Sequence, residues 1–382
     1  MKKINFGIIG CGLMGREFAS TVARWCHLTD MDVQPEITAI CNRSLSPAKM
    51  DWYTTHFPSI QQVTSDYTEL LANEQVDAVY VALPHNMHSE VYCAALKAGK
   101  HLLGEKPFGM DLEASDTIQK SLLAHPKPYA ACASQLIFFP GMQRILTMLA
   151  QDQFGRIIEV DAGFLHSSDL DPAKPINWKR MPELNGQYGP MGDLGSHVAL
   201  VPFRAGWDVL DTRAICSNII TERPDASGRL VPCDMWDNVT LLSTVRDPRH
   251  GNQFPWTLKT HRIMPGEMNT MYLNIFGTRA SAKFSLRNPK QMQILDYTGG
   301  DQTWQTVEPG FVTPYKTITG KAYEFGALDA IMQMVSAFMY ELSHGKCLSR
   351  TAACPTPQEM HGCHRLFTAA LKSHTTSQTV VL

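Results

Sequence analysis

The 382-residue sequence has no uncharged apolar run of 18 or more residues, and no pair of its ten cysteines is spaced C-x-x-C. The first absence argues against a membrane-spanning helix, and the second is unlike the dense cysteine frameworks of small secreted proteins. An excess of one charge is also missing, because 34 Lys and Arg oppose 36 Asp and Glu. A chain with this balance lacks the basic surface of a nucleic-acid-binding protein. We therefore expect a cytoplasmic protein with no nucleic-acid partner and no membrane association.

Strands and helices are predicted to alternate through the first third of the chain. Segments with helical spacing of apolar residues separate short, apolar, strand-like segments, which lie at 4–9, 37–41, 76–83, 101–105 and 129–134. This alternation predicts a doubly wound parallel sheet with helices on both faces. After about residue 135, strand-like segments follow one another with little helix between them, which favours an antiparallel or mixed sheet. The length fits about two domains.

A glycine pattern, Gly10-x-Gly12-x-x-Gly15, lies between the first predicted strand and the first predicted helix. In that context the first glycine allows a tight turn, the second lets a pyrophosphate approach the backbone, and the third lets helix and strand pack closely. An ordinary strand–helix turn is the alternative, but the context favours dinucleotide binding. The predicted phosphate-binding residues are Gly10, Cys11, Gly12, Leu13, Met14 and Gly15.

The end of the second predicted strand bears on the choice of dinucleotide. An acidic residue there favours NAD, and a nearby Arg accommodates the additional phosphate of NADP. This sequence has Asn42-Arg43-Ser44 and no carboxylate. Asn42 can bond a ribose hydroxyl, and Arg43 can pair with a phosphate or lie on the adenine. Both NAD and NADP therefore remain open, with Asn42 and Arg43 as predicted cofactor contacts.

Two further segments carry groups suited to proton transfer. Lys106 follows a predicted buried strand, at the sheet edge where α/β proteins bind ligands. Asp193 and His197 are spaced by four, which on a helix places them on one face, so that the carboxylate can orient the imidazole. Taken alone, each has an ordinary explanation: a solvated surface lysine for the first, and a helix-capping Asp with an incidental His for the second.

Together, these motifs resemble those of the glucose–fructose oxidoreductase / inositol dehydrogenase (Gfo/Idh/MocA) family. The run Phe276-Gly277-Thr278-Arg279-Ala280 is also similar to a late sheet turn of that family. The similarity spans most of the chain, in the family's order and spacing. It is carried by Gly10-Cys11-Gly12-Leu13-Met14-Gly15, Leu83-Pro84-His85-Asn86-Met87-His88, Gly104-Glu105-Lys106-Pro107 and Gly192-Asp193-Leu194-Gly195-Ser196-His197.

The resemblance implies a Rossmann domain at residues 1–130 and, at 131–382, an α/β domain with an open, mostly antiparallel sheet. The second domain would bind substrate and join subunits into a homodimer or homotetramer. It also implies NAD(P)-dependent hydride transfer at a secondary hydroxyl of a sugar, polyol or glycoside. The alternative is a redox-neutral glycoside hydrolase, which oxidises its substrate transiently, eliminates the aglycone and adds water.

The resemblance also assigns roles to individual residues. Lys106, Asp193 and His197 match the family's catalytic positions and would contact the substrate. The segment Asn177-Trp178-Lys179-Arg180 fits a substrate-facing loop, with Trp178 and Lys179 as substrate contacts, and its two cations could meet an anionic group on a sugar. The positions that match the nicotinamide side of the cofactor site are Pro84, Asn86, His88, Glu105, Lys106 and Pro107.

Two positions depart from the family pattern and leave the substrate open. Ile137 stands where an Arg is usual, and Leu200 stands where an Asp often follows the catalytic His. A different feature, His361-Gly362-Cys363-His364, has no second ligand pair and matches no ordinary zinc spacing, so we predict no metal site.

Overall fold

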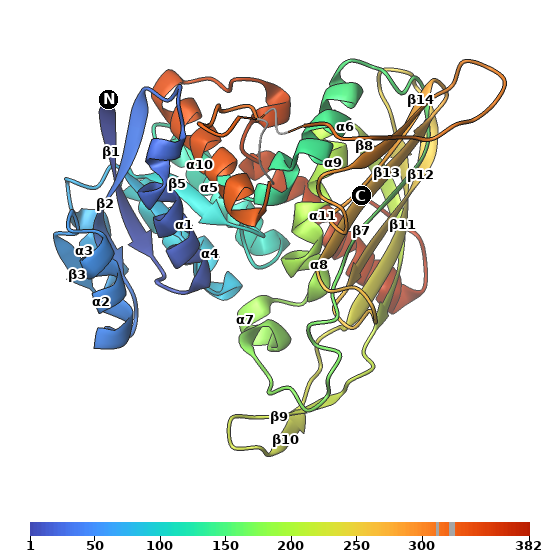
Figure 1. The fold of residues 1–382 in the computed structure, drawn as a ribbon. Helices are drawn as coiled ribbons and strands as arrows, with labels where there is room; N and C mark the ends of the chain where they lie inside the picture. The colour runs from blue at the N-terminus through green and yellow to red at the C-terminus, as the bar shows by residue number, and fades with distance from the viewer. Residues whose placement is uncertain (311–312, 321–324) are drawn as a thin grey trace. The chain divides into compact units, whose positions relative to one another are not determined.

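The computed structural model describes residues 1–310, 313–320 and 325–382, and it divides into two compact units (Figure 1). The first unit comprises Met1–Phe138 and Phe311–Gln358, and the second comprises Phe139–Gly310 and Glu359–Leu382. The units thus differ from the predicted division at residue 130, because the chain returns to the first unit near its end.

The physical reason for this return is apolar packing. The helix α10 (Ala327–His344) is buried on all sides over residues 330–339, and its Phe338 ring lies 6.1 Å from the ring of Phe6 and 5.4 Å from that of Tyr129. Both partners belong to the first 138 residues, so α10 completes the core of the first unit. A short 3₁₀ helix, η6 (Arg350–Ala352), follows in the same unit.

In the described part of the first unit, six parallel strands form a sheet in the order β3-β2-β1-β4-β5-β6. The predicted doubly wound parallel sheet is confirmed. Because the order reverses between β1 and β4, the carboxyl ends of β1, β4 and β5 lie side by side at the edge where such sheets bind ligands. The strands are β1 (Lys2–Ile9), β2 (Val33–Cys41), β3 (Gln62–Thr64), β4 (Ala78–Val81), β5 (His101–Glu105) and β6 (Ala130–Ala133).

The helices of the first unit follow from apolar spacing and capping. On α4, Val91 and Ala95 are one turn apart and fully buried. Asp66 caps α3 and Asp111 caps α5, since each carboxylate accepts a hydrogen bond from a backbone N–H in the first turn. The elements are α1 (Leu13–Ala23), η1 (Trp25–His27), α2 (Pro47–His56), α3 (Tyr67–Ala72), η2 (His85–Met87), α4 (His88–Lys97), α5 (Leu112–Ala124) and η3 (Gln135–Phe138).

In the second unit, nine strands within the described residues form a mixed sheet in the order β16-β15-β14-β13-β7-β12-β11-β8-β17. The pairs are antiparallel except β7 with β12, so the predicted mostly antiparallel sheet is confirmed. The strands are β7 (Ile157–Leu165), β8 (Asp208–Ser217), β11 (Asn238–Arg246), β12 (Gln253–His261), β13 (Thr270–Gly277), β14 (Ala280–Ser285), β15 (Met292–Asp296), β16 (Gln305–Val307) and β17 (Val380–Val381). A separate hairpin joins β9 (Glu222–Pro224) to β10 (Leu230–Pro232).

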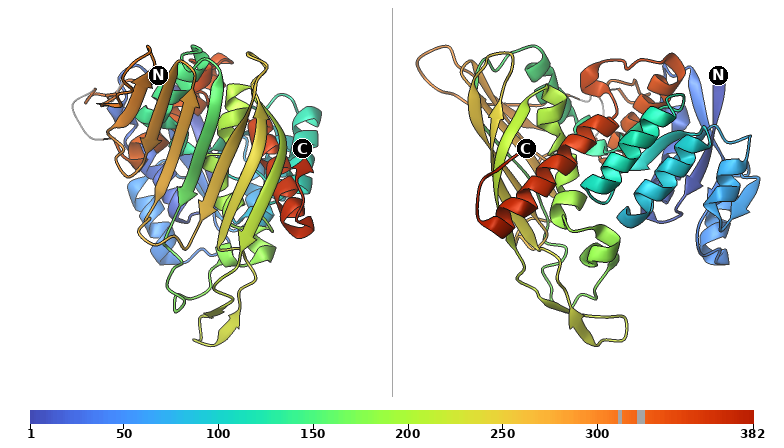
Figure 2. Two further views of the ribbon diagram at one scale, coloured as in Figure 1. Left: turned by 90° about the vertical axis from the view of Figure 1, so that its right-hand side faces the viewer. Right: turned by 180° about the vertical axis from the view of Figure 1, so that it is seen from behind.

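Helices cover one face of this mixed sheet, and the opposite face carries none in the views of Figure 2. The covering helices include α6 (Pro140–Ala150), α9 (Leu200–Ala205) and α11 (Pro357–Thr376). Along β11, Val239 and Leu241 are buried while Leu242 is 52% exposed, which is the alternation expected of a sheet with one open face. No helix in the described ranges is both long and apolar enough to cross a membrane.

The segment carrying Asp193 and His197 is not the single helix that its spacing predicts. It is divided into α8 (Pro190–Asp193), η5 (Gly195–His197) and α9. Gly192 and Gly195 weaken a continuous helix, and a Cβ at Gly195 would lie 3.1 Å from the Cγ2 of Thr260. Two short elements precede this segment, η4 (Trp178–Arg180) and α7 (Pro182–Asn185).

Candidate active site

The three glycines of the loop between β1 and α1 have different structural roles. Gly10 has φ +102°, and a Cβ there would lie 2.2 Å from the carbonyl oxygen of Ala82. A Cβ on Gly15 would lie 2.3 Å from the carbonyl oxygen of Gly10. A Cβ on Gly12 would meet nothing within 4 Å. The protein's own packing therefore requires the outer two glycines, whereas Gly12 leaves an open space that a ligand can fill.

This space lies at the start of α1, where backbone N–H groups point outward. Gly12 is the N-cap residue and no side chain caps the helix, so the first turn keeps donors available for an anion. Leu13 is 75% exposed, while the Cys11 side chain turns inward, where burial raises the pKa of its thiol to about 12. The loop thus fits the pyrophosphate of a dinucleotide.

The Asn42 amide joins this loop to the end of β2. Its Oδ1 accepts a hydrogen bond from the Cys11 backbone N–H at 3.2 Å, and its Nδ2 donates to the Ser44 carbonyl at 2.7 Å. Asn42 thereby holds the loop in place. Arg43 and Ser44 are exposed at the same turn. On the adjoining helices, the Arg16 guanidinium lies 5.1 Å from the ring centroid of Trp52.

The predicted cofactor residues after β4 differ in exposure. His88 is fully buried, its Nε2 lies 3.0 Å from the Leu83 carbonyl oxygen, and its ring stacks on Tyr92. Asn86 is exposed, and Pro84 is half-buried at the start of η2. His88 therefore lies where it shapes this turn, while Asn86 lies where a ligand can reach it.

The Glu105-Lys106-Pro107 turn is anchored by two buried tyrosines. Tyr80 donates to the Glu105 carboxylate at 2.6 Å, and Tyr92 donates to the Glu105 carbonyl at 2.7 Å. Burial, followed by the charge of Glu105, holds the pKa of Tyr80 well above its usual range, so this phenol stays a donor. Lys106 is half-buried immediately after β5, and the Lys106–Pro107 peptide bond is cis. The lysine is thus placed at the ligand-binding edge of the sheet.

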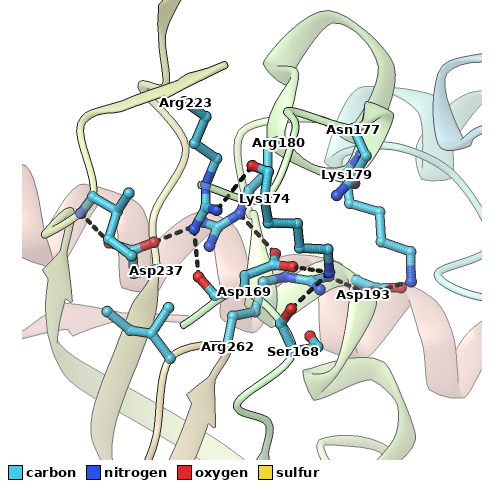
Figure 3. Close-up of polar contacts among 12 residues, drawn as sticks. Ser168, Asp169, Lys174, Asn177, Lys179, Arg180, Asp193, Arg223, Asp237 and Arg262 are labelled. Carbon is cyan, nitrogen blue, oxygen red and sulfur yellow. Dashed lines mark hydrogen bonds and ion pairs between the residues drawn. The ribbon is translucent and has the colours of Figure 1, made fainter. Parts of the chain in front are cut away.

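In the second unit, Asp193 lies among the charged side chains drawn in Figure 3, next to Lys179. Its buried carboxylate accepts hydrogen bonds at Oδ2 from the Lys179 Nζ, at 3.2 Å, and from the Arg262 guanidinium. The structure thus brings together two predicted site residues 14 positions apart, and it adds Arg262, which was not predicted. Two cations on one oxygen favour the ionised carboxylate.

The rings of two histidines contact the ring of Phe164, at the end of β7. The His197 ring centroid lies 5.7 Å from that of Phe164, and the His166 centroid lies 5.1 Å from it. Burial, and then the charge of Arg262, lowers the pKa of His166 to about 4. His166 is therefore neutral near pH 7. We call Asp193, Lys179, Arg262, His166 and His197 the Asp193 cluster.

A second ionic group, the Arg180 network, holds the loop that carries Lys179 (Figure 3). The side chain of Arg180 is fully buried, with Nε 2.8 Å from Asp169 and Nη1 2.8 Å from Asp237. Arg223, also buried, donates to the backbone carbonyls of Asp169 and Asp171, and Lys174 pairs with Asp169 at 2.7 Å. The network is defined as Arg180, Asp169, Asp237, Arg223 and Lys174.

Long-range strand pairing explains why sequence reasoning missed His166 and Arg262. β7 and β12 run parallel, with Leu165 paired to His261. The next residues, His166 and Arg262, therefore leave the sheet at the same edge, beside Asp193. A parallel pairing across more than ninety residues has no local signature in the sequence.

The described groups suit proton transfer to or from a bound hydroxyl. His197 can accept a proton near neutral pH, and Asp193, fixed by two cations, can orient charge beside it but is poorly suited to act as the base. The first unit offers a phosphate cradle and a lysine at its sheet edge. Trp178 is half-buried beside Lys179, whose Nζ lies 5.8 Å from its ring centroid.

Comparison with known proteins agrees with this picture. Residues 4–130 match the model of the oxidoreductase family with an NAD-binding Rossmann fold. Over 354 residues the chain is 23% identical to levoglucosan dehydrogenase of Pseudarthrobacter phenanthrenivorans, covering 85% of this chain and 83% of that enzyme. A levoglucosan dehydrogenase structure in complex with NADH and levoglucosan aligns with a TM-score of 0.88 at 21% identity, over 100% of this chain and 99% of that one. An oxidoreductase domain protein from Kribbella flavida aligns with a TM-score of 0.89, also at 21% identity, over 100% of this chain and 99% of that one.

Proposed function

Because the Rossmann segment belongs to the Gfo/Idh/MocA family of NAD-binding oxidoreductases, we propose that the protein transfers a hydride between a secondary hydroxyl and NAD or NADP. The substrate class is a sugar, polyol or glycoside, as the similarity to levoglucosan dehydrogenase suggests. The observation that carries the proposal is the buried carboxylate of Asp193, which lies four residues before His197 in the sequence. Two cations, Lys179 and Arg262, form ion pairs with this carboxylate. It occurs in a chain whose glycine loop leaves room for a pyrophosphate.

Each residue of the proposed mechanism has one task. When bound, the nicotinamide supplies the carbon that accepts or donates the hydride. His197 takes the hydroxyl proton during oxidation and returns it during reduction. Lys106 supplies positive charge suited to stabilising a developing alkoxide. Asp193 remains a carboxylate because Lys179 and Arg262 donate to it, and it sets the orientation and charge around His197.

The test is turnover by His197→Ala and Lys106→Ala, with dinucleotide affinity measured in parallel. We expect each substitution to lower kcat by about 10²- to 10⁴-fold, the usual contribution of a general acid–base group. Lys120→Ala, at an exposed lysine on α5, is the matched control and should keep full activity. Near wild-type turnover by both site variants would contradict the assignment. Turnover without net change in the dinucleotide would instead indicate the redox-neutral hydrolase.

The turn after β2 supports NADP as the preferred dinucleotide. It has no carboxylate to repel a ribose phosphate, and it exposes the cationic Arg43. The side-chain amide of Asn42 is already hydrogen-bonded to the backbone of Cys11 and Ser44. It therefore contributes less to the recognition of a ribose hydroxyl than an amide without these bonds would. Arg43 would therefore offer NADP a charged partner at this turn, whereas NAD would find no carboxylate partner there.

The open face of the mixed sheet supports self-association of the chain. Ile215 on β8 and Leu242 on β11 are 63% and 52% exposed, and the strand register places them as diagonal neighbours on this face. Burying such apolar side chains against a second copy is favourable. We therefore propose a homodimer or homotetramer joined through this sheet. Light scattering after size-exclusion chromatography would contradict it by showing a monomer at micromolar concentration.

A further inference from the structure

The charged groups drawn in Figure 3 carry more positive than negative charge. The cations are Lys174, Lys179, Arg180, Arg223 and Arg262, and the carboxylates are Asp169, Asp193 and Asp237, a difference of 5 − 3 = +2. Adding the exposed Asp171, whose carboxylate accepts from the Ala173 backbone N–H, still leaves a positive excess. The whole chain, by contrast, has a net charge of −2. Positive charge is therefore gathered in this region.

Part of that charge is already neutralised inside the Arg180 network. Arg180 lies between Asp169 and Asp237, and Lys174 also pairs with Asp169, which makes two cations for two carboxylates. Arg223 donates to backbone carbonyls and so retains its positive charge. Arg180, Asp169, Asp237 and Arg223 are buried, and Lys174, which is 40% exposed, already pairs with Asp169.

In the Asp193 cluster, in contrast, two cations contact a single carboxylate oxygen. Lys179 and Arg262 donate to the same oxygen of Asp193, which makes two cations for one carboxylate. The Arg262 side chain is 4% exposed, and its Nη2 makes the guanidinium's hydrogen bond to Asp193. Its Nε is buried with no hydrogen-bond partner in the described residues. The guanidinium is thus only partly satisfied by the protein.

A neutral imidazole lies next to these cations. His166, whose ring contacts Phe164 as the ring of His197 does, is held uncharged by burial and by Arg262, so it adds no further positive charge near pH 7. Lys179 and Arg262 share one carboxylate oxygen, and a carboxylate on a ligand would offer both cations a second acceptor.

We propose that the substrate carries a carboxylate, as a uronate or aldonate does, and that Lys179 and Arg262 bind this group. Arginine and lysine form strong charge-assisted hydrogen bonds with carboxylates. Lys179 is 39% exposed and so lies within reach of a ligand. This inference rests on the proposed dehydrogenase function and narrows its substrate class to sugar acids.

The test compares matched substrate pairs that differ only in this group: D-glucuronate with D-glucose, and D-galacturonate with D-galactose, with D-glucose 6-phosphate as the phosphate arm. We expect kcat/KM to be about tenfold to a hundredfold higher for the acid of a pair. Lys179→Gln should remove most of this preference, while Lys174→Gln, which changes a cation of the Arg180 network, should keep it. Equal or higher kcat/KM for the neutral sugar would overturn the inference, as would a preference for the phosphate.

Titration calorimetry of the dinucleotide-loaded protein with the same compounds separates the inference from the proposed function. Binding of an acid that Lys179→Gln weakens at least about tenfold, without turnover, would support the carboxylate site and contradict the dehydrogenase. Turnover of neutral sugars alone would support the dehydrogenase and contradict the carboxylate site. Neither turnover nor binding of any compound would contradict both.

Discussion

The glycine loop of the first unit and the Asp193 cluster of the second offer different groups to a ligand. At the loop, the groups are backbone N–H donors at the start of α1 and an empty space at Gly12. In the cluster, they are the buried side chains of Asp193 and Arg262 and the more exposed Lys179. Backbone donors do not titrate, and the fold sets their directions. A buried charge is stable only while its oppositely charged partner is present. Removing one partner by substitution, or neutralising it by a change in pH, therefore destabilises the other strongly.

The strongest way to sharpen this contrast is to remove Arg180, the centre of the buried network. Arg180→Met leaves Asp169 and Asp237 without their shared buried cation. We expect a loss of about 3–5 kcal/mol in the free energy of unfolding, measured by urea denaturation. Arg246→Met breaks the exposed Arg246–Asp208 pair and should cost at most about 1 kcal/mol. Equal losses of unfolding free energy in the two variants would mean that burial does not make the Arg180 network more stabilising than an exposed ion pair.

A pair of substitutions in the glycine loop separates packing from ligand space. Gly15→Ala should lower the free energy of unfolding by about 1–3 kcal/mol, because its Cβ meets the Gly10 carbonyl oxygen. In Gly12→Ala the new Cβ has no protein atom within 4 Å, so the free energy of unfolding of this variant should equal that of the wild type. Its dissociation constant for NADPH, followed by fluorescence, should nonetheless rise at least about tenfold. The reverse pattern would show that Gly12 is needed only for the fold.

Arg43 tests whether a charged side chain also matters in the first unit. If Arg43 pairs with the ribose phosphate, Arg43→Ala should raise the KM for NADP by about 5- to 30-fold, the loss of one charge-assisted contact. The KM for NAD should change by less than about twofold, since NAD lacks that phosphate. A similar increase for both dinucleotides would place Arg43 against the adenine instead.

The smallest expected effect is a pH dependence of stability contributed by the second unit. Burial lowers the pKa of His166 in the folded protein to about 4, from an ordinary value of 6.5. Between these values the unfolded chain binds more protons, so the contribution of His166 to stability falls as pH decreases from about 6.5 to about 4. Urea unfolding of His166→Gln across this window should show a shallower fall than the wild type. The exposed His56→Gln serves as the control, and equal slopes for wild type and His166→Gln would contradict the prediction.

The parts of the fold that could be predicted depend on local patterns. The strands and helices of the first unit follow from apolar runs and spacing, and the glycine loop follows from three residues within six positions. Short strands such as Gln62–Thr64 were missed, because three residues hold too little pattern. The helix expected to carry Asp193 and His197 is interrupted, because tertiary packing at Gly195 outweighs the helical spacing of these two residues.

The charged groups were harder to predict than the backbone. Lys179 and Asp193 could be singled out by motif position, but their ion pair could not, because it depends on how the loop folds back. Arg262 lies 69 residues from Asp193 and reaches it through a parallel strand pair. Burial also could not be read locally: Arg180 and Lys179 are neighbours in sequence, yet the first is fully enclosed and the second is 39% exposed.

The return of α10 to the first unit bears on how the chain is synthesised. The Phe6 core stays incomplete until Phe338 has been translated, 338 − 138 = 200 residues after the last of the unit's N-terminal part. At a synthesis rate of about 5–20 residues per second, that interval lasts on the order of 10–40 s. During this time the nascent chain carries an apolar surface that only its later portion can cover. The first unit therefore cannot be completed on the ribosome before most of the second unit has been made.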